Sequence, residues 1–258
     1  MAQRPETWKA LDNLAREAGK LAQEVGRADQ EIKDDGTLVT QADQACEALI
    51  VAGLGRLFPE DGLIGEEGAA TQGRSGRRWY IDPIDGTQAF VERLAYWGPT
   101  FCCLDDQGPL LGVTHFPMLG ETWFYQRGQG AYCGDRRLQP LRERPIDRRS
   151  TVLVPSRWWR WFEMDWPGRA RNLGGLAAHL AMAAQGGPRA VFVPAGWKIW
   201  DVATGLGLLA EVGARATPLV GEAFASPLDA VHSGGKPFVV GSPEAVERLK
   251  AGLVFRGA

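Results

Sequence analysis

The 258-residue sequence predicts an α+β half followed by an α/β half. Two long helical patterns precede a run of strand-like segments from Pro99 to Tyr125, which is typical of an antiparallel meander. After residue 150 strand-like and helix-like segments alternate, as they do in α/β folds. The charged stretch PLRERPIDRRS, residues 140–150, separates the two patterns, so we expect an amino-terminal half at 1–143 and a carboxyl-terminal half at 144–258.

Two helices and a short strand are expected before the meander. Apolar residues recur at helical spacing from Glu6 to Ile32, and a second helical pattern over 40–58 stops at Pro59. A turn and a short extended piece should join them. The Gly-rich segment 61–76 indicates an irregular loop. RRWYID at 77–82 then predicts a strand, and GTQAFVERL at 86–94 predicts the beginning of a helix.

The later elements follow the same rules. A hairpin at 128–139 should close the meander. Beyond the charged stretch we expect strands at 151–156 and 190–195, helices at 174–186 and 201–213, and a last strand and helix over 237–253. His179 stands within an apolar helical segment and is expected to be a packed residue.

Composition excludes several classes of function. The net charge of −2 gives no overall basic footprint, so a nucleic acid polymer is not an expected partner. No segment approaches the ~20 apolar residues of a membrane-spanning helix, and the charged start has no signal-peptide core. The four cysteines lack CxxC spacing, so buried reduced thiols are expected. We therefore expect a cytoplasmic protein with no membrane partner.

Acidic residues stand at strand ends, helix starts and Gly-rich turns in four parts of the chain. These residues are Asp43, Glu66, Glu67, Asp82, Asp85 and Asp201. Mg²⁺ prefers oxygen ligands and often binds a few carboxylates together with a substrate phosphate. Pro83 stiffens the turn between the paired aspartates, and the Ile84 carbonyl can add an oxygen. Gly86 and Thr87 open a helix whose free N–H groups can bind an anion. The pattern predicts phosphoryl chemistry beside a metal site.

Helix capping is the competing interpretation of these acids. Asp85 and Asp201 each precede an apolar helical run, where Asp is a common N-cap. Thr40 and Asp43 have the spacing of a capping box. Capping does not explain Asp82 three residues before Asp85, nor the GEE loop, so the set as a whole favours metal binding.

Other chemistries have little support in the sequence. The three histidines have no zinc-type spacing, and neither a P-loop framework nor a G-x-S-x-G elbow is present. The spacing D-x-x-D-G-T differs by one residue from the D-x-D-x-[TV] pattern of phosphatases with an aspartyl nucleophile.

The motifs resemble those of the inositol monophosphatase superfamily, which consists of Mg²⁺-dependent, lithium-sensitive phosphomonoesterases. DPIDGTQAF matches the family's central signature without a gap, and WDVATGLGLLAEVGA resembles its second signature. IGEEG is similar to its glutamate loop, DGTLVTQAD to the piece that leads into its second helix, and GGLAAHLAMAAQG to the turn and helix before the second signature. The resemblance spans roughly residues 30–215 and implies a layered α-β-α-β-α sandwich, and often a homodimer.

The resemblance also implies a role for each matching position. Glu66, Asp82 and the Ile84 carbonyl would hold one metal, and Asp82, Asp85 and Asp201 a second. Glu66 and Thr87 would polarise the attacking water, Asp43 would support a weaker third site, and the amides of Gly86 and Thr87 would hold phosphate. Two or three Mg²⁺ ions are implied, with Mn²⁺ as a substitute. Substrate contacts would involve Asp85, Gly175, Ala177, Pro194, Lys198 and Asp201.

Two departures concern the substrate. Inositol-specific members have a glutamate seven residues before the aspartate of the WD motif, where this chain has Pro194, which can only accept through its carbonyl. Lys198 replaces a histidine of the family and adds a positive charge. In contrast, FVERLAYWGPTFCCL resembles the histidinol-phosphatase branch, in which Trp-Gly follows the first signature.

The Trp-rich segment RWWRWFEMDW, residues 157–166, allows two interpretations. It could pack at a domain or dimer interface, or it could form an aromatic wall beside the substrate, because an exposed apolar patch of this size is otherwise a liability. The leading hypothesis is a Mg²⁺-dependent phosphatase that acts on histidinol phosphate, inositol phosphate or another small phosphorylated alcohol. A 3′(2′),5′-bisphosphate nucleotidase and a catalytically silent binding protein of the same fold are the alternatives.

Overall fold

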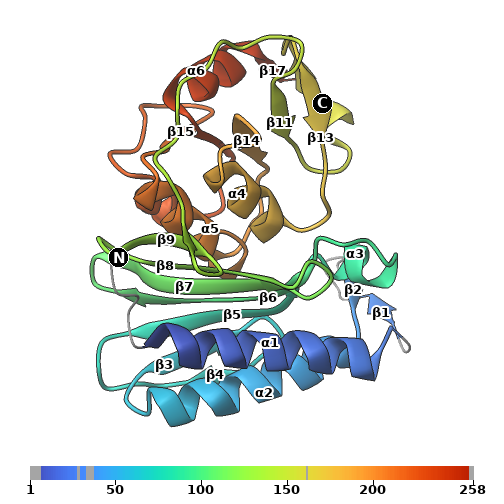
Figure 1. The fold of residues 1–258 in the computed structure, drawn as a ribbon, viewed down its shortest axis with the longest axis vertical. Helices are drawn as coiled ribbons and strands as arrows, with labels where there is room; N and C mark the ends of the chain where they lie inside the picture. Colours follow the sequence, from blue (N-terminus) through green and yellow to red (C-terminus); the bar gives the residue numbers. More distant parts are fainter. Residues whose placement is uncertain (1–6, 28–29, 33–37, 161, 256–258) are drawn as a thin grey trace.

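Helical layers and sheets alternate from one end of the molecule to the other in the computed structural model (Figure 1), which describes residues 7–27, 30–32, 38–160 and 162–255. Helices α1 (Thr7–Val25) and α2 (Gln41–Leu57) form the first layer, and a large sheet forms the second. Helices α4 (Leu176–Ala184) and α5 (Ile199–Glu211) lie between this sheet and a smaller one, and α6 (Pro243–Gly252) covers the far face. The predicted α-β-α-β-α sandwich is confirmed.

Helix α1 follows its predicted apolar pattern, with Leu11, Leu14 and Ala18 buried against the large sheet. It is shorter than predicted. Gly26 takes a left-handed φ of 84°, which glycine adopts without strain, and its N–H closes the helix on the Ala22 carbonyl. Strand β1 (Glu31–Ile32) then pairs with β2 (Leu38–Val39). Part of the predicted turn, residues 33–37, lies outside the described residues.

The large sheet has the order β10-β9-β8-β7-β6-β5-β3-β4. Its bounds are β3 (Gly62–Gly65), β4 (Ala70–Thr71), β5 (Arg78–Asp85), β6 (Gly98–Asp105), β7 (Gly108–Phe116), β8 (Glu121–Gln126), β9 (Gly130–Cys133) and β10 (Arg136–Arg137). The predicted meander and closing hairpin are confirmed. The irregular loop predicted over 61–76 was partly wrong, because β3 and β4 pair across the GEEG turn and β3 also lies parallel to β5.

The smaller sheet is mixed, with the order β13-β11-β14-β16-β15. Its strands are β11 (Thr151–Leu153), β13 (Arg169–Arg171), β14 (Ala190–Val193), β15 (Arg215–Pro218) and β16 (Phe238–Gly241). Strand β11 is parallel to both of its neighbours, whereas β16 is antiparallel to β14 and β15. The alternation in the sequence predicted β11, β14 and β16 but not the edge strands. A short ribbon of β12 (Phe162–Met164) with β17 (Leu253–Phe255), and the turns η1 (Trp158–Arg160) and η2 (Pro227–His232), were not predicted either.

The main hydrophobic core lies between the two sheets and contains most of α4 and α5. Two glycines of α5 allow this close packing. A Cβ atom on Gly207 would lie 1.9 Å from the Tyr125 ring, and one on Gly205 would lie 2.3 Å from Leu180. The sequence therefore brings the start of α5, which carries Asp201, down onto the large sheet.

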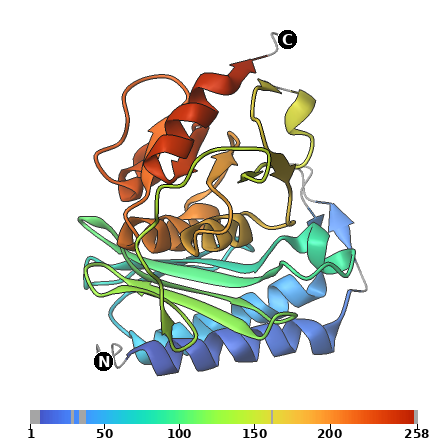
Figure 2. The same ribbon diagram turned by 45° about the horizontal axis from the view of Figure 1, so that its top comes forward.

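A connection without regular structure, residues 138–150, runs from the large sheet past the helical layer to the smaller sheet (Figure 2). The predicted division between residues 143 and 144 falls within this segment and stays a prediction. None of the helices in the described ranges is both long enough and apolar enough to cross a membrane.

Candidate active site

A cavity of about 400 Å³ lies where β3, β5, α3 (Thr87–Val91) and α5 meet. Strands β3 and β5 are parallel, so their carboxyl ends reach the same edge of the sheet. Glu66 follows β3, Asp82 and Asp85 belong to β5, and Asp201 stands in the first turn of α5. The lining residues are Ile32, Leu38, Glu66, Asp82, Ile84, Asp85, Gly86, Thr87, Gln88 and Asp201. Within the described part of the chain this wall carries four carboxylates and no basic side chain.

An irregularity in β5 directs the two aspartates. The register with β6 shifts between Asp82, which lies opposite Thr100, and Asp85, which lies opposite Gly98. The Ile84 N–H donates to Asp82 Oδ1 at 2.9 Å, which closes a tight turn through Pro83. This turn explains how two carboxylates three residues apart can both reach one cavity.

Asp85 caps a helix, but not the helix that follows it in sequence. Its carboxylate accepts hydrogen bonds from the N–H groups of Leu176 and Ala177 at the start of α4, each at 3.1 Å. Gly175 makes the approach possible, because a Cβ atom there would lie 1.9 Å from Asp85 Oδ2. The expected cap of the next helix, α3 (Thr87–Val91), is provided by Gly86, which has a left-handed φ of 81°. Gly175 and Ala177, predicted as substrate contacts, lie against Asp85, and their contact with a substrate stays a prediction.

The predicted capping box at Thr40 and Asp43 is confirmed. Asp43 Oδ2 accepts the Thr40 N–H at 2.8 Å and the Thr40 hydroxyl at 2.6 Å. Its other oxygen accepts the hydroxyl of Thr87 at 3.2 Å, and that hydroxyl also lies 3.1 Å from the Ile84 carbonyl. Asp43 is therefore buried behind the cavity wall and positions Thr87.

Asp201 both caps a helix and lies in the carboxylate cavity, so it matches the two interpretations of the acids, capping and a place in a metal site. It is the third helical residue of α5, and its Oδ2 accepts the Lys198 N–H at 2.7 Å, as in a capping box. It also lines the carboxylate cavity. The Lys198 side chain is not part of that wall.

Two carboxylates of the cavity, Asp82 and Asp85, resist ionisation. Burial is the main cause of the raised pKa of Asp82, and repulsion from Glu66, Asp85 and Asp201 adds to it. Burial also raises the pKa of Asp85 to about 7, despite the amides of α4 that lower it. Burial also raises the pKa of Asp43. Such an arrangement favours a bound cation, since a positive charge would offset both burial and repulsion.

The donor set fits a hard divalent cation, which prefers carboxylate and carbonyl oxygens to nitrogen or sulfur. As they stand, however, no three His, Cys, Asp or Glu side chains in the described ranges are arranged to hold a metal ion. The carboxylates face a common cavity and would have to draw together around the ion, as expected for groups that repel one another.

Glu47 is the site residue that the sequence analysis missed. It is buried on α2, and its two carboxylate oxygens accept the N–H groups of Glu67 at 2.8 Å and Ala69 at 2.9 Å. Both amides belong to the turn that carries Glu66. A Cβ atom on Gly65 would lie 2.2 Å from Glu47 Oε2, so Gly65 lets the carboxylate reach the turn. The sequence did offer one indication of this role. Glu47 is an acid four residues after Asp43, so it lies on the same, buried face of the predicted helix.

Two features used to predict the substrate lie outside the carboxylate cavity. Pro194 lines a separate cavity of about 110 Å³ together with His179, which is buried as predicted. Trp97, of the Trp-Gly pair, is buried against Phe90 with ring centroids 4.6 Å apart. Gly98 lies so close to the His115 carbonyl that a Cβ atom could not be placed there. The Trp-Gly pair is therefore a packing feature in this chain.

The Trp-rich segment does not line the carboxylate cavity in its described part. Trp158 and Trp166 pack into the cluster beneath α6, and the Trp166 indole donates to the Ser150 carbonyl at 3.0 Å. Trp159 is 54% exposed, and Trp161 lies outside the described residues. These contacts favour the packing interpretation over an aromatic wall at the catalytic cavity.

Comparisons with known proteins agree with this arrangement. A histidinol-phosphatase from Chlorobaculum parvum is 42% identical over 139 residues, about half of each chain, and one from Mycobacterium tuberculosis is 31% identical over 233 residues, covering 85% of this chain and 87% of the relative. An inositol-1-monophosphatase from Mesorhizobium japonicum is also 31% identical, covering 83% and 82%.

The structure of an IMPase from Thermotoga maritima superposes with a TM-score of 0.82 at 25% identity, covering 96% of both chains. The profile described as "Inositol monophosphatase family" matches residues 4–249. The chain belongs to the inositol monophosphatase family and is a phosphatase.

Proposed function

We propose that this protein hydrolyses the phosphomonoester of a small phosphorylated alcohol and that the reaction depends on Mg²⁺, with Mn²⁺ as a substitute. The observation that carries the proposal is the cavity wall with Glu66, Asp82, Asp85 and Asp201 and no basic side chain among its described residues. A substrate phosphate is an anion and would be repelled by this wall unless cations were bound first. A cation requirement follows from the charge of the site itself.

The residues of the cavity wall suggest which oxygens would hold each cation. Glu66, Asp82 and the Ile84 carbonyl would hold one cation, and Asp82, Asp85 and Asp201 would hold a second. Bound cations would supply a water of lowered pKa and would neutralise charge on the phosphate and the leaving oxygen. Asp43 lies behind the wall, and its part in a third site would be indirect, through Thr87.

The chain's own groups orient the attacking water and the phosphate. The Thr87 hydroxyl donates to Asp43 and lies near the Ile84 carbonyl, so its lone pairs remain free to accept a hydrogen bond from a water. We assign Glu66, half-buried in the same wall, as the carboxylate that takes the proton from that water. The first amides of α3, at Gly86 and Thr87, have no acceptor within the helix and would donate to the phosphate oxygens.

Histidinol phosphate is the first candidate substrate. Two of the relatives above are named histidinol-phosphatases, and Pro194 cannot replace the glutamate of inositol-specific members. An inositol monophosphate is the second candidate, because the Mesorhizobium japonicum relative, which is 31% identical like the Mycobacterium tuberculosis one, is named an inositol-1-monophosphatase. The leaving alcohol would extend toward Pro194 and Lys198, beyond the start of α4. We also propose that the protein acts in the cytoplasm as a homodimer.

A screen of phosphate release tests the proposal. We expect Mg²⁺-dependent release from histidinol phosphate with a higher kcat/KM than from inositol 1-phosphate or adenosine 3′,5′-bisphosphate. Preference for the bisphosphate would favour the nucleotidase alternative. Calorimetric binding of Mg²⁺ with no release from any of the three would favour a silent binding protein. The absence of both binding and release would remove the proposal.

A further inference from the structure

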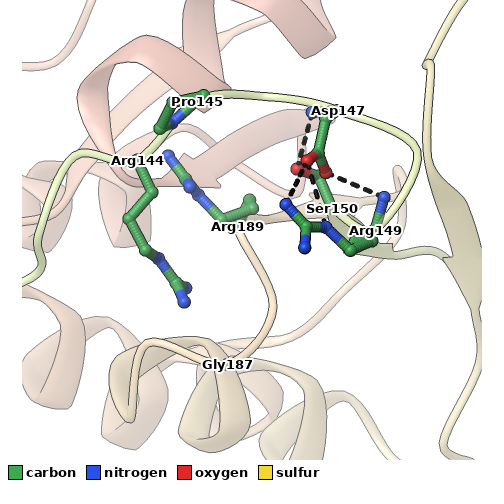
Figure 3. A pocket seen from close by; sticks show the side chains of 7 residues that line it. All are labelled: Arg144, Pro145, Asp147, Arg149, Ser150, Gly187 and Arg189. Carbon is green, nitrogen blue, oxygen red and sulfur yellow. Dashed lines mark hydrogen bonds and ion pairs between the residues drawn. The ribbon is translucent and has the colours of Figure 1, made fainter.

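A second cavity, of about 340 Å³, lies at the amino end of β14 and shares no lining residue with the carboxylate cavity. Asp201 follows the other end of β14, so the two cavities lie toward opposite edges of the smaller sheet. The connection between the two sheets and the loop after α4 form the walls of the second cavity. The lining residues are Arg144, Pro145, Asp147, Arg149, Ser150, Gly187 and Arg189 (Figure 3). We call this space the arginine cavity.

Arg189 is the feature of this cavity that most needs an explanation. Its side chain is 4% exposed, yet both of its contacts in the described structure are long. The guanidinium lies 3.4 Å from the Ser242 hydroxyl and 3.5 Å from a Glu143 carboxylate oxygen. A guanidinium has five N–H donors, and burying it with weak partners costs free energy. An anion in the cavity would accept hydrogen bonds from the Arg189 N–H groups that do not contact Ser242 or Glu143.

Two more arginines reach the mouth of the cavity. Figure 3 shows Arg144 on one side of Arg189 and the Asp147–Arg149 pair on the other. Arg149 is 80% exposed and lies 2.9 Å from Asp147, and Arg144 donates to the Gly186 carbonyl. The lining has three guanidinium groups against one carboxylate, and Glu143 beside Arg189 adds a second carboxylate, which leaves an excess of one positive charge in a chain whose net charge is −2. This local excess of positive charge is opposite in sign to the charge of the whole protein.

The basic surface continues into a neighbouring cavity. A space of about 360 Å³ shares Arg144 with the arginine cavity and is also lined by Arg142, Gln139 and Gln185. Each of the two cavities has the volume of a small-molecule site, which is about 300–1,000 Å³. Together they would accommodate a ligand with several anionic groups, one buried against Arg189 and others near Arg142 and Arg144.

We propose that the arginine cavity is a second anion site, which binds a small metabolite carrying a chain of phosphate groups. Phosphate fits the observations because guanidinium groups bind it with two parallel hydrogen bonds and because three of them line this cavity. The burial of Arg189 favours a small ligand, since an extended polymer or a membrane surface would contact the exposed arginines without reaching it. The site is independent of the phosphatase reaction.

Calorimetry with tripolyphosphate tests the site. The full-length protein is used with EDTA, because the described wall of the carboxylate cavity has four acidic side chains and no basic one and, without a cation, should not attract the anion. We expect saturable binding with a Kd below about 1 mM. Binding should weaken at least about tenfold in R144Q and in R149Q, because each removes a charged hydrogen-bond donor. R189Q should abolish it.

The controls separate this site from general charge attraction and from catalysis. Arg56 is exposed on α2, far along the chain from the cavity, and R56Q should bind tripolyphosphate like the wild type. Asp85→Asn should also leave binding unchanged. If R189Q does not fold, as judged by circular dichroism, the exposed positions 144 and 149 still decide the question. No saturable binding, an equal loss in R56Q, or a loss in Asp85→Asn would overturn the proposal.

Discussion

Asp85 accepts hydrogen bonds from two amides of α4 and also lies in the wall of the carboxylate cavity. The capping interpretation therefore holds for Asp85, and its place in the wall is compatible with the proposed metal binding. What the sequence could not show was which helix it caps, because Leu176 and Ala177 are about ninety residues away. At the residue scale, the motifs predicted which acids lie together, but not the helix that Asp85 caps.

Asp85→Asn should uncouple the protein's stability from Mg²⁺. The raised pKa of Asp85, about 7, means that its charge is unfavourable in the metal-free fold, and a neutral amide removes that charge but accepts only one of the two α4 N–H groups. These two effects oppose each other in EDTA, so the test is the change in stability on adding Mg²⁺. Activity should fall at least about a hundredfold. Thermal unfolding with and without Mg²⁺ checks this: the wild type should gain stability on adding Mg²⁺ and the variant should gain much less.

Asp106→Asn is the matched control, because Asp106 is an exposed acid outside the cavity. It should keep the full Mg²⁺-dependent shift. An Asp85→Asn protein that gains as much from Mg²⁺ as the wild type would show that Asp85 does not bind the cation.

Glu47→Gln should weaken catalysis by releasing the turn that carries Glu66. The amide can accept only one of the two N–H groups that the carboxylate accepts, and it turns its own donors toward the other. We expect a loss of stability of about 1–3 kcal/mol. The measurement that identifies a positioning role is kinetic: kcat should fall and the Mg²⁺ concentration for half-maximal rate should rise.

Glu211 provides a control with the same geometry. It accepts the Gly128 and Gly130 N–H groups, each at 2.7 Å, at a hairpin outside the site. Glu211→Gln should lose a similar amount of stability with unchanged kinetic constants. Equal kinetic behaviour of the two variants would assign Glu47 a purely structural role.

At the element scale, the site depends on how closely α4 approaches β5. Gly175→Ala places a Cβ atom where Asp85 Oδ2 now lies, so the helix start and the carboxylate must separate. We expect a loss of activity of about a hundredfold or more, because misplacement of about 1 Å at a reacting site can have that effect. Steady-state kinetics with saturating Mg²⁺ measure the loss.

Gly55→Ala is the comparison for this substitution. A Cβ atom on Gly55 in α2 has no neighbour within 4 Å, so the change should raise helix stability by about 0.5–1 kcal/mol and leave activity unaltered. Wild-type activity in Gly175→Ala would contradict the role given to the α4–Asp85 contact.

The sequence predicted the helices and strands that have a long apolar pattern, and it missed those whose pattern is short. Helix α4, in which eight of nine residues are apolar or small, and the meander strands carry enough periodicity to be recognised. Strand β4 has two residues, and β13 is an exposed edge strand with two arginines, so neither has an apolar pattern of its own. Their pairing depends on partners elsewhere in the chain, which the sequence alone does not reveal.

At the scale of the whole molecule, buried histidines should make the fold sensitive to acid. Burial lowers the pKa of His115 to about 4, and that of His179 to about 4 as well. In the unfolded chain each would have its ordinary pKa of about 6.5. The folded state therefore binds fewer protons between these values, and its stability falls as the pH drops from about 6.5 to 4, by about 1.4 kcal/mol per pH unit for each histidine.

Chemical denaturation of wild type and His115→Gln at pH 7 and pH 5 isolates one of these contributions. Asp82 and Asp85 have raised pKa values and act in the opposite direction, but they are present in both proteins and cancel in the difference. The wild type should lose more stability than the variant on acidification. His232 is exposed, so His232→Gln should lose as much stability on acidification as the wild type. An equal loss in His115→Gln would contradict the account.

The layered sandwich and the cavity of acids were predicted from the chain because the motifs fall at the strand ends and helix starts that the fold brings together. The arginine cavity was not. Arg144 and Arg149 were seen only as a charged boundary, and their meeting with Arg189 depends on how the connection crosses the smaller sheet. Such contacts between distant segments appear only at the scale of the whole molecule.

The rate of phosphate release from histidinol phosphate during a Mg²⁺ titration of EDTA-treated protein tests the central claim most directly. The account predicts no release without the cation, saturable activation by Mg²⁺, and at least about a hundredfold less activity in Asp82→Asn at every concentration. Release that proceeds equally in EDTA, or that Asp82→Asn leaves intact, would contradict it.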